Sequence, residues 1–199
     1  MIFAAGLGTR LKPFTESHPK ALLPLAGKTL LQWQIEKLRE AGISEIVVNI
    51  HHFGQQIIDY LRENEGFGCK VLISDERDEL LETGGGLLKA VELLGTDEPV
   101  LVCNVDILSN INLNKLIVES RKSKVESTVA EGARRNSAES RTDEREDLAT
   151  VVVSERETQR YLLFDGEGVM KGWMNKKTGE YKPQQAENED LVPLAFSGM

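Results

Sequence analysis

The alternation of two kinds of apolar pattern is the feature that most limits the folds open to this chain. Short runs rich in Val, Ile and Leu alternate with segments in which apolar residues recur every three or four positions. The first pattern is typical of strands buried on both faces, and the second of amphipathic helices. Such an order predicts an α/β fold with a mainly parallel sheet and helices on both faces. The predicted strands are 45–50, 69–73 and 99–103, and the predicted helices are 29–41, 54–64, 86–94 and 112–120.

The last third of the chain departs from this alternation. Residues 134–147 are mostly charged, with Ala138 as the only aliphatic side chain, which predicts a solvated and mobile insertion. Further on, Asp165-Gly166-Glu167-Gly168 lies between two apolar runs and is typical of a hairpin turn, so we expect a C-terminal β-hairpin. The runs on either side are 160–164 and 169–173, and further strands are expected at 148–153 and 191–199.

The length, the net charge and the apolar runs of the chain exclude some classes of protein. A chain of 199 residues is long enough for one domain with its own core, so we expect residues 1–199 to form a single domain. The net charge of −8 argues against nucleic acid as a partner. No apolar run approaches the roughly 20 residues of a membrane span, and the start lacks a basic leader segment, so no membrane partner is expected.

The two cysteines indicate the compartment. Cys69 and Cys103 lie in apolar, strand-like runs, which favours buried free thiols over a disulfide or a metal site. We therefore expect a cytoplasmic protein.

A glycine loop and a group of cations near the start predict an anion site. Glycines allow a backbone loop to approach an anion closely, and Arg10 and Lys20 supply donors for phosphoryl oxygens. The alternative is a plain strand-to-loop turn, which accounts for the glycines but not for Arg10, Pro19 and Lys20. The loop has the sequence Phe3-Ala4-Ala5-Gly6-Leu7-Gly8-Thr9-Arg10-Leu11.

Two better-known glycine loops do not fit these residues. A dinucleotide-binding fingerprint needs a third glycine where Leu11 stands. A P-loop needs Gly-Lys-Ser/Thr after four intervening residues, and nothing of the kind follows Gly6.

The loop together with Pro19-Lys20-Ala21-Leu22-Leu23-Pro24 resembles the signature of the sugar-phosphate nucleotidyltransferases, in which A-A-G-x-G-T-R and P-K-x-L-x-P occur in this order. Two segments are most similar to the N-acetylmuramate-1-phosphate uridylyltransferase group, itself similar to mannose-1-phosphate guanylyltransferases: Leu81-Glu82-Thr83-Gly84-Gly85-Gly86 and the closing Ala195-Phe196-Ser197-Gly198. The resemblance implies a Rossmann-like, three-layer fold, Mg²⁺ as cofactor, and catalytic roles for Arg10 and Lys20. It also implies that the nucleotide contacts Ala4, Ala5, Gly6, Gly8, Thr9, Arg10 and Lys20.

A second glycine-rich segment, Glu82-Thr83-Gly84-Gly85-Gly86, opens a predicted helix. Taken alone it fits a flexible turn with Thr83 as the helix N-cap. The resemblance assigns the nucleotide base to this segment, with Glu82, Thr83, Gly84 and Gly85 as the residues that contact it.

A third segment, Asn104-Val105-Asp106, follows the predicted strand 99–103. A carboxylate at such a strand end suits Mg²⁺, although an aspartate that caps a turn fits the residues as well. The resemblance makes Asp106 the metal ligand, and it places Asn104 and Gly198 at the sugar phosphate. Val105 departs from the family pattern, which has glycine there.

The implied reaction joins a nucleoside triphosphate to a sugar 1-phosphate and releases pyrophosphate, with UTP and N-acetylmuramate 1-phosphate or GTP and mannose 1-phosphate as substrates. The resemblance also implies a second metal-binding aspartate downstream of residue 198. We therefore expect a chain truncated at its C-terminus. The alternative function is a catalytically weak nucleotide-sugar-binding or regulatory module.

Overall fold

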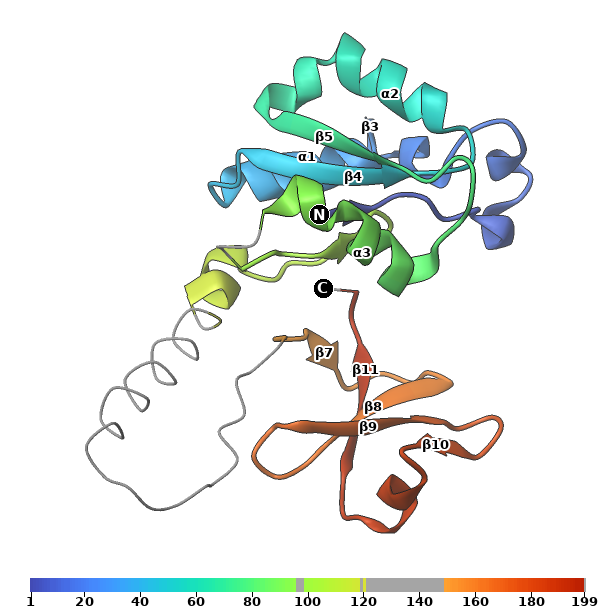
Figure 1. The fold of residues 1–199 in the computed structure, drawn as a ribbon, viewed down its shortest axis with the longest axis vertical. Coiled ribbons are helices and arrows are strands. Elements are labelled where there is room, and N and C mark those ends of the chain that lie inside the picture. The colour runs from blue at the N-terminus through green and yellow to red at the C-terminus, as the bar shows by residue number, and fades with distance from the viewer. Residues whose placement is uncertain (96–98, 119, 121–148, 199) are drawn as a thin grey trace. The chain divides into compact units, whose positions relative to one another are not determined.

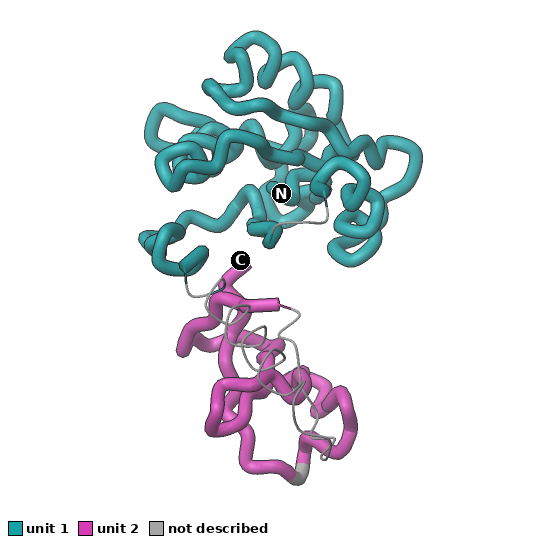
Figure 2. The backbone as a smooth tube through the Cα atoms, turned by 60° about the vertical axis from the view of Figure 1, so that its left-hand side comes forward, with its two compact units in different colours: residues 1–148 teal, residues 149–199 magenta. Residues whose placement is uncertain are grey.

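The structure is a computed structural model that describes residues 1–95, 99–118, 120 and 149–198. The chain divides into two compact units, Met1–Leu148 and Ala149–Met199, and each is described by itself (Figure 2). The charged insertion predicted at 134–147 lies outside the described residues. The expectation of one domain over 1–199 stays a prediction.

The first unit is built on a four-stranded parallel sheet with the order β5-β4-β1-β6 (Figure 1). Its register aligns Phe3 with Asn49 on one side and with Asn104 on the other. Because all four strands run in one direction, their carboxyl ends meet at one edge. The strands are β1 (Ile2–Phe3), β4 (Glu45–Ile50), β5 (Lys70–Asp75) and β6 (Cys103–Asn104).

Helices cover both faces of this sheet, as the sequence predicts. Helix α3 (Glu82–Leu94) packs on the face that carries Val47, where Met1, Val47 and Ala90 form a buried cluster. Helix α2 (Gly54–Glu63) begins against Ile50, on the opposite face. Figure 1 shows α2 and α3 on opposite sides of β4.

Helix α1 (Leu30–Glu40) lies beside α2, since the Tyr60 hydroxyl of α2 donates a hydrogen bond to Gln32 of α1. Its ends follow the expected chemistry. The Thr29 hydroxyl accepts a hydrogen bond from the Gln32 backbone N–H at 3.0 Å, and Gly42, with φ of 85°, ends the helix. Apolar spacing was enough to predict this element.

Three predicted elements have other bounds in the structure. One is the strand predicted at 148–153, of which the described residues form only β7 (Val153–Ser154). The strand predicted at 99–103 is reduced to Cys103–Asn104, because its only partner in the described sheet, β1, is itself two residues long. Helix α3 begins at Glu82, one turn before the predicted residue 86, and its N-cap residue is Leu81 rather than Thr83. A short hairpin of β2 (Pro24–Leu25) and β3 (Lys28–Thr29) was not predicted at all.

The second unit is a five-stranded antiparallel sheet with the order β10-β9-β8-β11-β7. The predicted hairpin is confirmed: the Asp165 N–H donates to the Val169 carbonyl at 3.0 Å, closing the turn between β8 and β9. Hydrogen bonds from the Val169 N–H and from Lys171 hold the pKa of Asp165 below its usual value. The strands are β7 (Val153–Ser154), β8 (Arg160–Phe164), β9 (Met170–Asn175), β10 (Glu180–Lys182) and β11 (Val192–Phe196).

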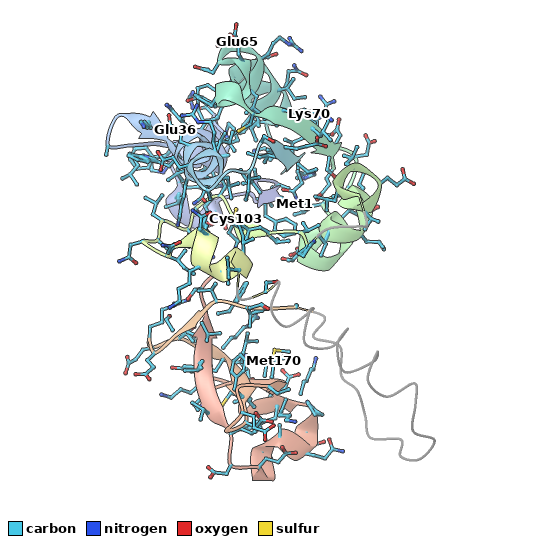
Figure 3. All side chains as sticks on the ribbon, turned by 90° about the vertical axis from the view of Figure 1, so that its left-hand side faces the viewer. Met1, Glu36, Glu65, Lys70, Cys103 and Met170 are labelled. Carbon is cyan, nitrogen blue, oxygen red and sulfur yellow. The ribbon has the colours of Figure 1, made fainter. Side chains whose placement is uncertain are left out.

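Both cysteines are buried free thiols, as predicted. Cys103 lies next to Met1 across the β1–β6 pairing, and its Sγ donates to the Met1 carbonyl (Figure 3). Burial raises the pKa of each thiol. Among the described helices, none combines the length and the apolar character that a membrane crossing requires.

Two glycines of helix α3 allow a test of how closely the helix packs on the sheet. A Cβ added at Gly86 would lie 2.7 Å from Glu76 Oε1, whereas no described atom comes within 4 Å of one at Gly84. We expect Gly86→Ala to lower the free energy of unfolding by about 1–3 kcal/mol through overpacking. Gly84→Ala, the matched control, should raise it by about 0.5–1 kcal/mol because alanine favours helix. Urea denaturation measures both values, and equal shifts of one sign would contradict the packing described.

Candidate functional site

The predicted site residues of the first unit gather at the carboxyl edge of the parallel sheet. The glycine loop leaves β1, and Asp106 follows β6, the neighbour of β1. The Val105 N–H donates to the Phe3 carbonyl at 3.1 Å, which ties the two strand ends together. In open α/β sheets this edge is the usual place for a ligand.

The glycine loop is folded tightly around Gly8. Gly8 has φ of 62°, and a Cβ there would lie 2.9 Å from Thr15 Cγ2 and 3.1 Å from Lys20 Cβ. The buried Thr15 hydroxyl donates to the Gly8 carbonyl at 2.9 Å. Gly6, Thr9 and Arg10 are exposed on this loop. Glycine is thus needed at position 8 both for the backbone angle and for space.

Lys20 and Asp106 form an ion pair, although 86 positions separate them in the sequence. Lys20 begins a short 3-10 turn, Lys20–Leu22, directly after Pro19. The pair brings the predicted catalytic cation and the predicted metal ligand together. Both side chains are partly exposed, so a ligand can reach them.

A buried polar network leads from the glycine loop to the start of α3. Asn49 Oδ1 accepts hydrogen bonds from the backbone N–H groups of Ala4 and Ala5, at 2.6 and 3.3 Å. Asn49 Nδ2 donates to Glu76 Oε1 at 2.8 Å, and Glu76 Oε2 accepts from the Leu81 N–H at 3.3 Å. The amide hydrogens of Ala4 and Ala5 are therefore engaged inside the protein.

The segment predicted to contact the base forms the first turn of α3. Glu82, Thr83 and Gly84 are exposed, and Gly85 is half-buried. Glu82 has φ of 57°, a left-handed conformation that is uncommon for a residue with a side chain. Strained backbone of this kind often occurs at functional sites.

The two residues predicted at the sugar phosphate lie in different units. Asn104 ends β6 and is half-buried, level with Phe3 in the sheet. Gly198 belongs to the second unit, where it is buried and has φ of 82°. The roles of Asn104 and Gly198 stay predictions.

Sequence reasoning missed Asn49 and Glu76. Asn49 is the only polar residue inside the otherwise apolar run 46–50, and Glu76 follows the next strand. A polar side chain inside a strand buried on both faces must find a partner, and this is the signal that could have revealed the pair. The partner itself, 27 positions away, could not be read from the sequence.

Chemically, this edge combines a close-approach backbone loop, the cations Arg10 and Lys20 and the accessible carboxylate of Asp106. Among the described residues, no three His, Cys, Asp or Glu side chains group as metal ligands. One carboxylate still suits Mg²⁺, because this ion commonly takes one or two protein carboxylates and fills its other positions with water and phosphate oxygens. Asp106 fits that requirement.

Comparison with known proteins gives the family. Over 108 residues, covering 53% of this chain and 44% of the relative, the sequence is 45% identical to N-acetylmuramate alpha-1-phosphate uridylyltransferase of Caulobacter vibrioides. It is 34% identical over 119 residues to mannose-1-phosphate guanylyltransferase 1 of Arabidopsis thaliana, covering 59% of this chain and 33% of that relative. The matches thus cover less than half the length of either relative.

The fold comparison agrees with the sequence comparison. The crystal structure of HddC from Yersinia pseudotuberculosis superposes with a TM-score of 0.67 over 99% of this chain and 72% of that one, at 22% identity. This likeness supports the Rossmann-like fold that the sequence predicts. The family model described as nucleotidyl transferase matches residues 1–166. With that match over most of its length, the chain belongs to the nucleotidyl transferase family.

Proposed function

We propose that this protein transfers a nucleotidyl group from a nucleoside triphosphate to a sugar 1-phosphate, forming a nucleotide sugar and pyrophosphate. The observation that carries this proposal is the Lys20–Asp106 ion pair at the carboxyl edge of β1 and β6, beside the glycine loop. A phosphate-binding cation and a hard-oxygen metal ligand are the two protein groups that such a reaction needs at one place.

The reaction needs alignment more than proton transfer. One phosphate oxygen of the sugar 1-phosphate attacks the α-phosphorus, a new P–O bond forms, and the bond to the bridging oxygen breaks as pyrophosphate leaves. A phosphate monoester has its second pKa near 6, so this oxygen is already ionised at neutral pH. No side chain has to act as a base, and the protein's task is to bring two polyanions together.

The residues divide this task between them. The loop at Gly6, Gly8 and Thr9, in which Gly6 and Thr9 are exposed, accommodates the triphosphate. Arg10 and Lys20 neutralise charge that grows on the leaving pyrophosphate. Ala4 and Ala5 contribute through position, because their N–H groups are held by Asn49. Glu82 to Gly85 contact the base, and Asn104 contacts the sugar phosphate.

Asp106 is the residue that would hold Mg²⁺. When bound, Mg²⁺ supplies charge neutralisation and Lewis-acid polarisation of phosphoryl oxygens. Asp106 would hold the ion from the protein side, and Lys20 would then contact a phosphate. The carboxylate and the ammonium that would take these roles are adjacent in the structure.

UTP with N-acetylmuramate 1-phosphate is the substrate pair that we favour. The uridylyltransferase relative is 45% identical, against 34% for the guanylyltransferase. GTP with mannose 1-phosphate is the second pair.

Pyrophosphate release from each triphosphate and sugar phosphate tests the proposal directly. We expect release from one pair with a kcat at least about tenfold above the others, in the presence of Mg²⁺. If no pair releases pyrophosphate while UTP or GTP still binds measurably, the protein is a nucleotide-sugar-binding or regulatory module instead. Isothermal titration calorimetry supplies the binding measurement.

Arg10→Ala tests the role of the loop guanidinium. If Arg10 contacts charge that develops during the reaction, kcat should fall by about 100-fold or more, while the Kd for the triphosphate changes by less than about threefold. Arg10→Lys, which keeps the charge but not the fork of donors, should recover part of kcat. Equal losses in kcat and affinity would rule out this role.

Asp106→Asn tests the metal assignment. The substitution removes the charge with little change in shape, so we expect the Mg²⁺ concentration for half-maximal pyrophosphate release to rise at least about tenfold. Asp75→Asn is the matched control: Asp75 ends β5, and hydrogen bonds from Arg77 hold its pKa below the usual value. It should leave the Mg²⁺ dependence unchanged, and similar shifts in both variants would contradict the assignment.

A further inference from the structure

We infer that the buried Asn49–Glu76 pair sets the spacing between the glycine loop and the first turn of α3, and so positions the two ends of a bound nucleoside triphosphate. The inference deepens the proposed function and rests on it for the identity of the ligand. Asn49 and Glu76 act through other groups, so they are positioning residues.

The contacts form an unbroken chain from one segment to the other. The Ala4 and Ala5 N–H groups donate to Asn49 Oδ1, Asn49 Nδ2 donates to Glu76 Oε1, and the Leu81 N–H donates to Glu76 Oε2. Ala4 opens the glycine loop and Leu81 is the N-cap residue of α3. Two side chains therefore join the predicted phosphate and base segments.

Because Asn49 and Glu76 are buried, a polar atom of either side chain that lacks a hydrogen bond would be costly in free energy. Asn49 is 2% exposed and Glu76 is fully buried. A carboxylate and an amide in such a place are costly unless each polar atom is paired, and an apolar pair would fill the same space without that cost. A buried polar pair of this kind is best explained by the fixed geometry that its hydrogen bonds impose.

The backbone around Glu76 is held as well as its side chain. The Glu76 N–H donates to the Ile50 carbonyl at 2.8 Å, and His51 Nδ1 donates to the Glu76 carbonyl at 2.6 Å. Gly86 lets α3 approach the carboxylate, since a Cβ there would meet both Glu76 and Asn49. The carboxylate is thus fixed relative to the sheet and to the helix.

The pattern of donors and acceptors is determined by the backbone. Two N–H groups face Asn49, so its oxygen must point at them and its Nδ2 at Glu76. Both Glu76 oxygens then accept an N–H. In Glu76→Gln one oxygen becomes an NH₂ group, which must face another donor at Asn49 or at Leu81.

A reciprocal exchange restores the pattern. In the double variant Asn49→Asp with Glu76→Gln, the new aspartate accepts from Ala4, Ala5 and the new glutamine, whose own oxygen accepts from Leu81. Every hydrogen bond is kept, with one reversed in direction. Asn49→Asp alone places two carboxylates against each other.

The first measurement is amide hydrogen exchange by NMR, without any nucleotide. We expect Glu76→Gln and Asn49→Asp each to speed exchange at Ala4, Ala5 and Leu81 by about tenfold or more, and the double variant to return these rates to within about threefold of the unsubstituted protein. Two results would show that the two segments are not coupled. In one, Glu76→Gln speeds amide exchange at Leu81 alone; in the other, exchange in the double variant is as fast as in the faster of the two single variants.

The second measurement compares a ligand that spans both segments with one that contacts only the loop. Glu76→Gln should raise the Kd for UTP with Mg²⁺ by about tenfold, but the Kd for inorganic tripolyphosphate with Mg²⁺ by less than about threefold. Equal changes for both ligands would overturn the positioning role. Ile57→Ala, which opens the core on the other face of the sheet, lowers Tm as a control and should leave both Kd values within about twofold.

Failure to fold is also informative. If the single variants unfold while the double variant folds and binds UTP, the hydrogen-bond pattern is confirmed as the link; if none of the three folds, that claim is wrong. If the unsubstituted protein binds neither UTP nor GTP, the proposed function fails. The exchange rates at Ala4, Ala5 and Leu81 still decide whether the two segments are coupled.

Discussion

The parallel pairing of β1 with β4 on one side and β6 on the other is the constraint on which the rest of the site depends. β1 has only two residues, yet this register sets Phe3 level with both Asn49 and Asn104. The glycine loop and Asp106 consequently follow neighbouring strands at one edge of the sheet, and Asn49 accepts hydrogen bonds from the Ala4 and Ala5 N–H groups where β1 ends. A shift of β1 by one residue would turn its side chains to the other face of the sheet and move these N–H groups away from Asn49.

Sequence patterns were sufficient where structure is decided locally. The strand at 45–50 and the helix from Leu30 to Glu40 follow from apolar spacing. Local patterns failed where a distant partner determines the length of an element. β6 is short because β1 is short, and α3 starts early because its N-cap residue Leu81 donates a hydrogen bond to the Glu76 carboxylate. Neither length can be read from the residues that form the element.

The same distinction applies to the site. Arg10, Lys20, Glu82 and Asp106 carry unusual chemistry at recognisable places, so the sequence identifies them as candidates. The Asn49–Glu76 contact and the Lys20–Asp106 ion pair join residues that are distant in the sequence, and only the fold brings them together. Family membership rests on the match over residues 1–166, while substrate and metal stay proposals.

The Lys20–Asp106 ion pair has a consequence for how a charged ligand is received. An unpaired carboxylate at this edge of the sheet would repel a triphosphate, but the Asp106 carboxylate is already paired with the Lys20 ammonium. Under the proposed function, Lys20 would turn to a phosphate of the triphosphate, and Asp106 would hold Mg²⁺. Each of the two side chains would then exchange one oppositely charged partner for another. The ion pair would thus let the site receive a polyanion without an excess of positive charge on an otherwise acidic protein.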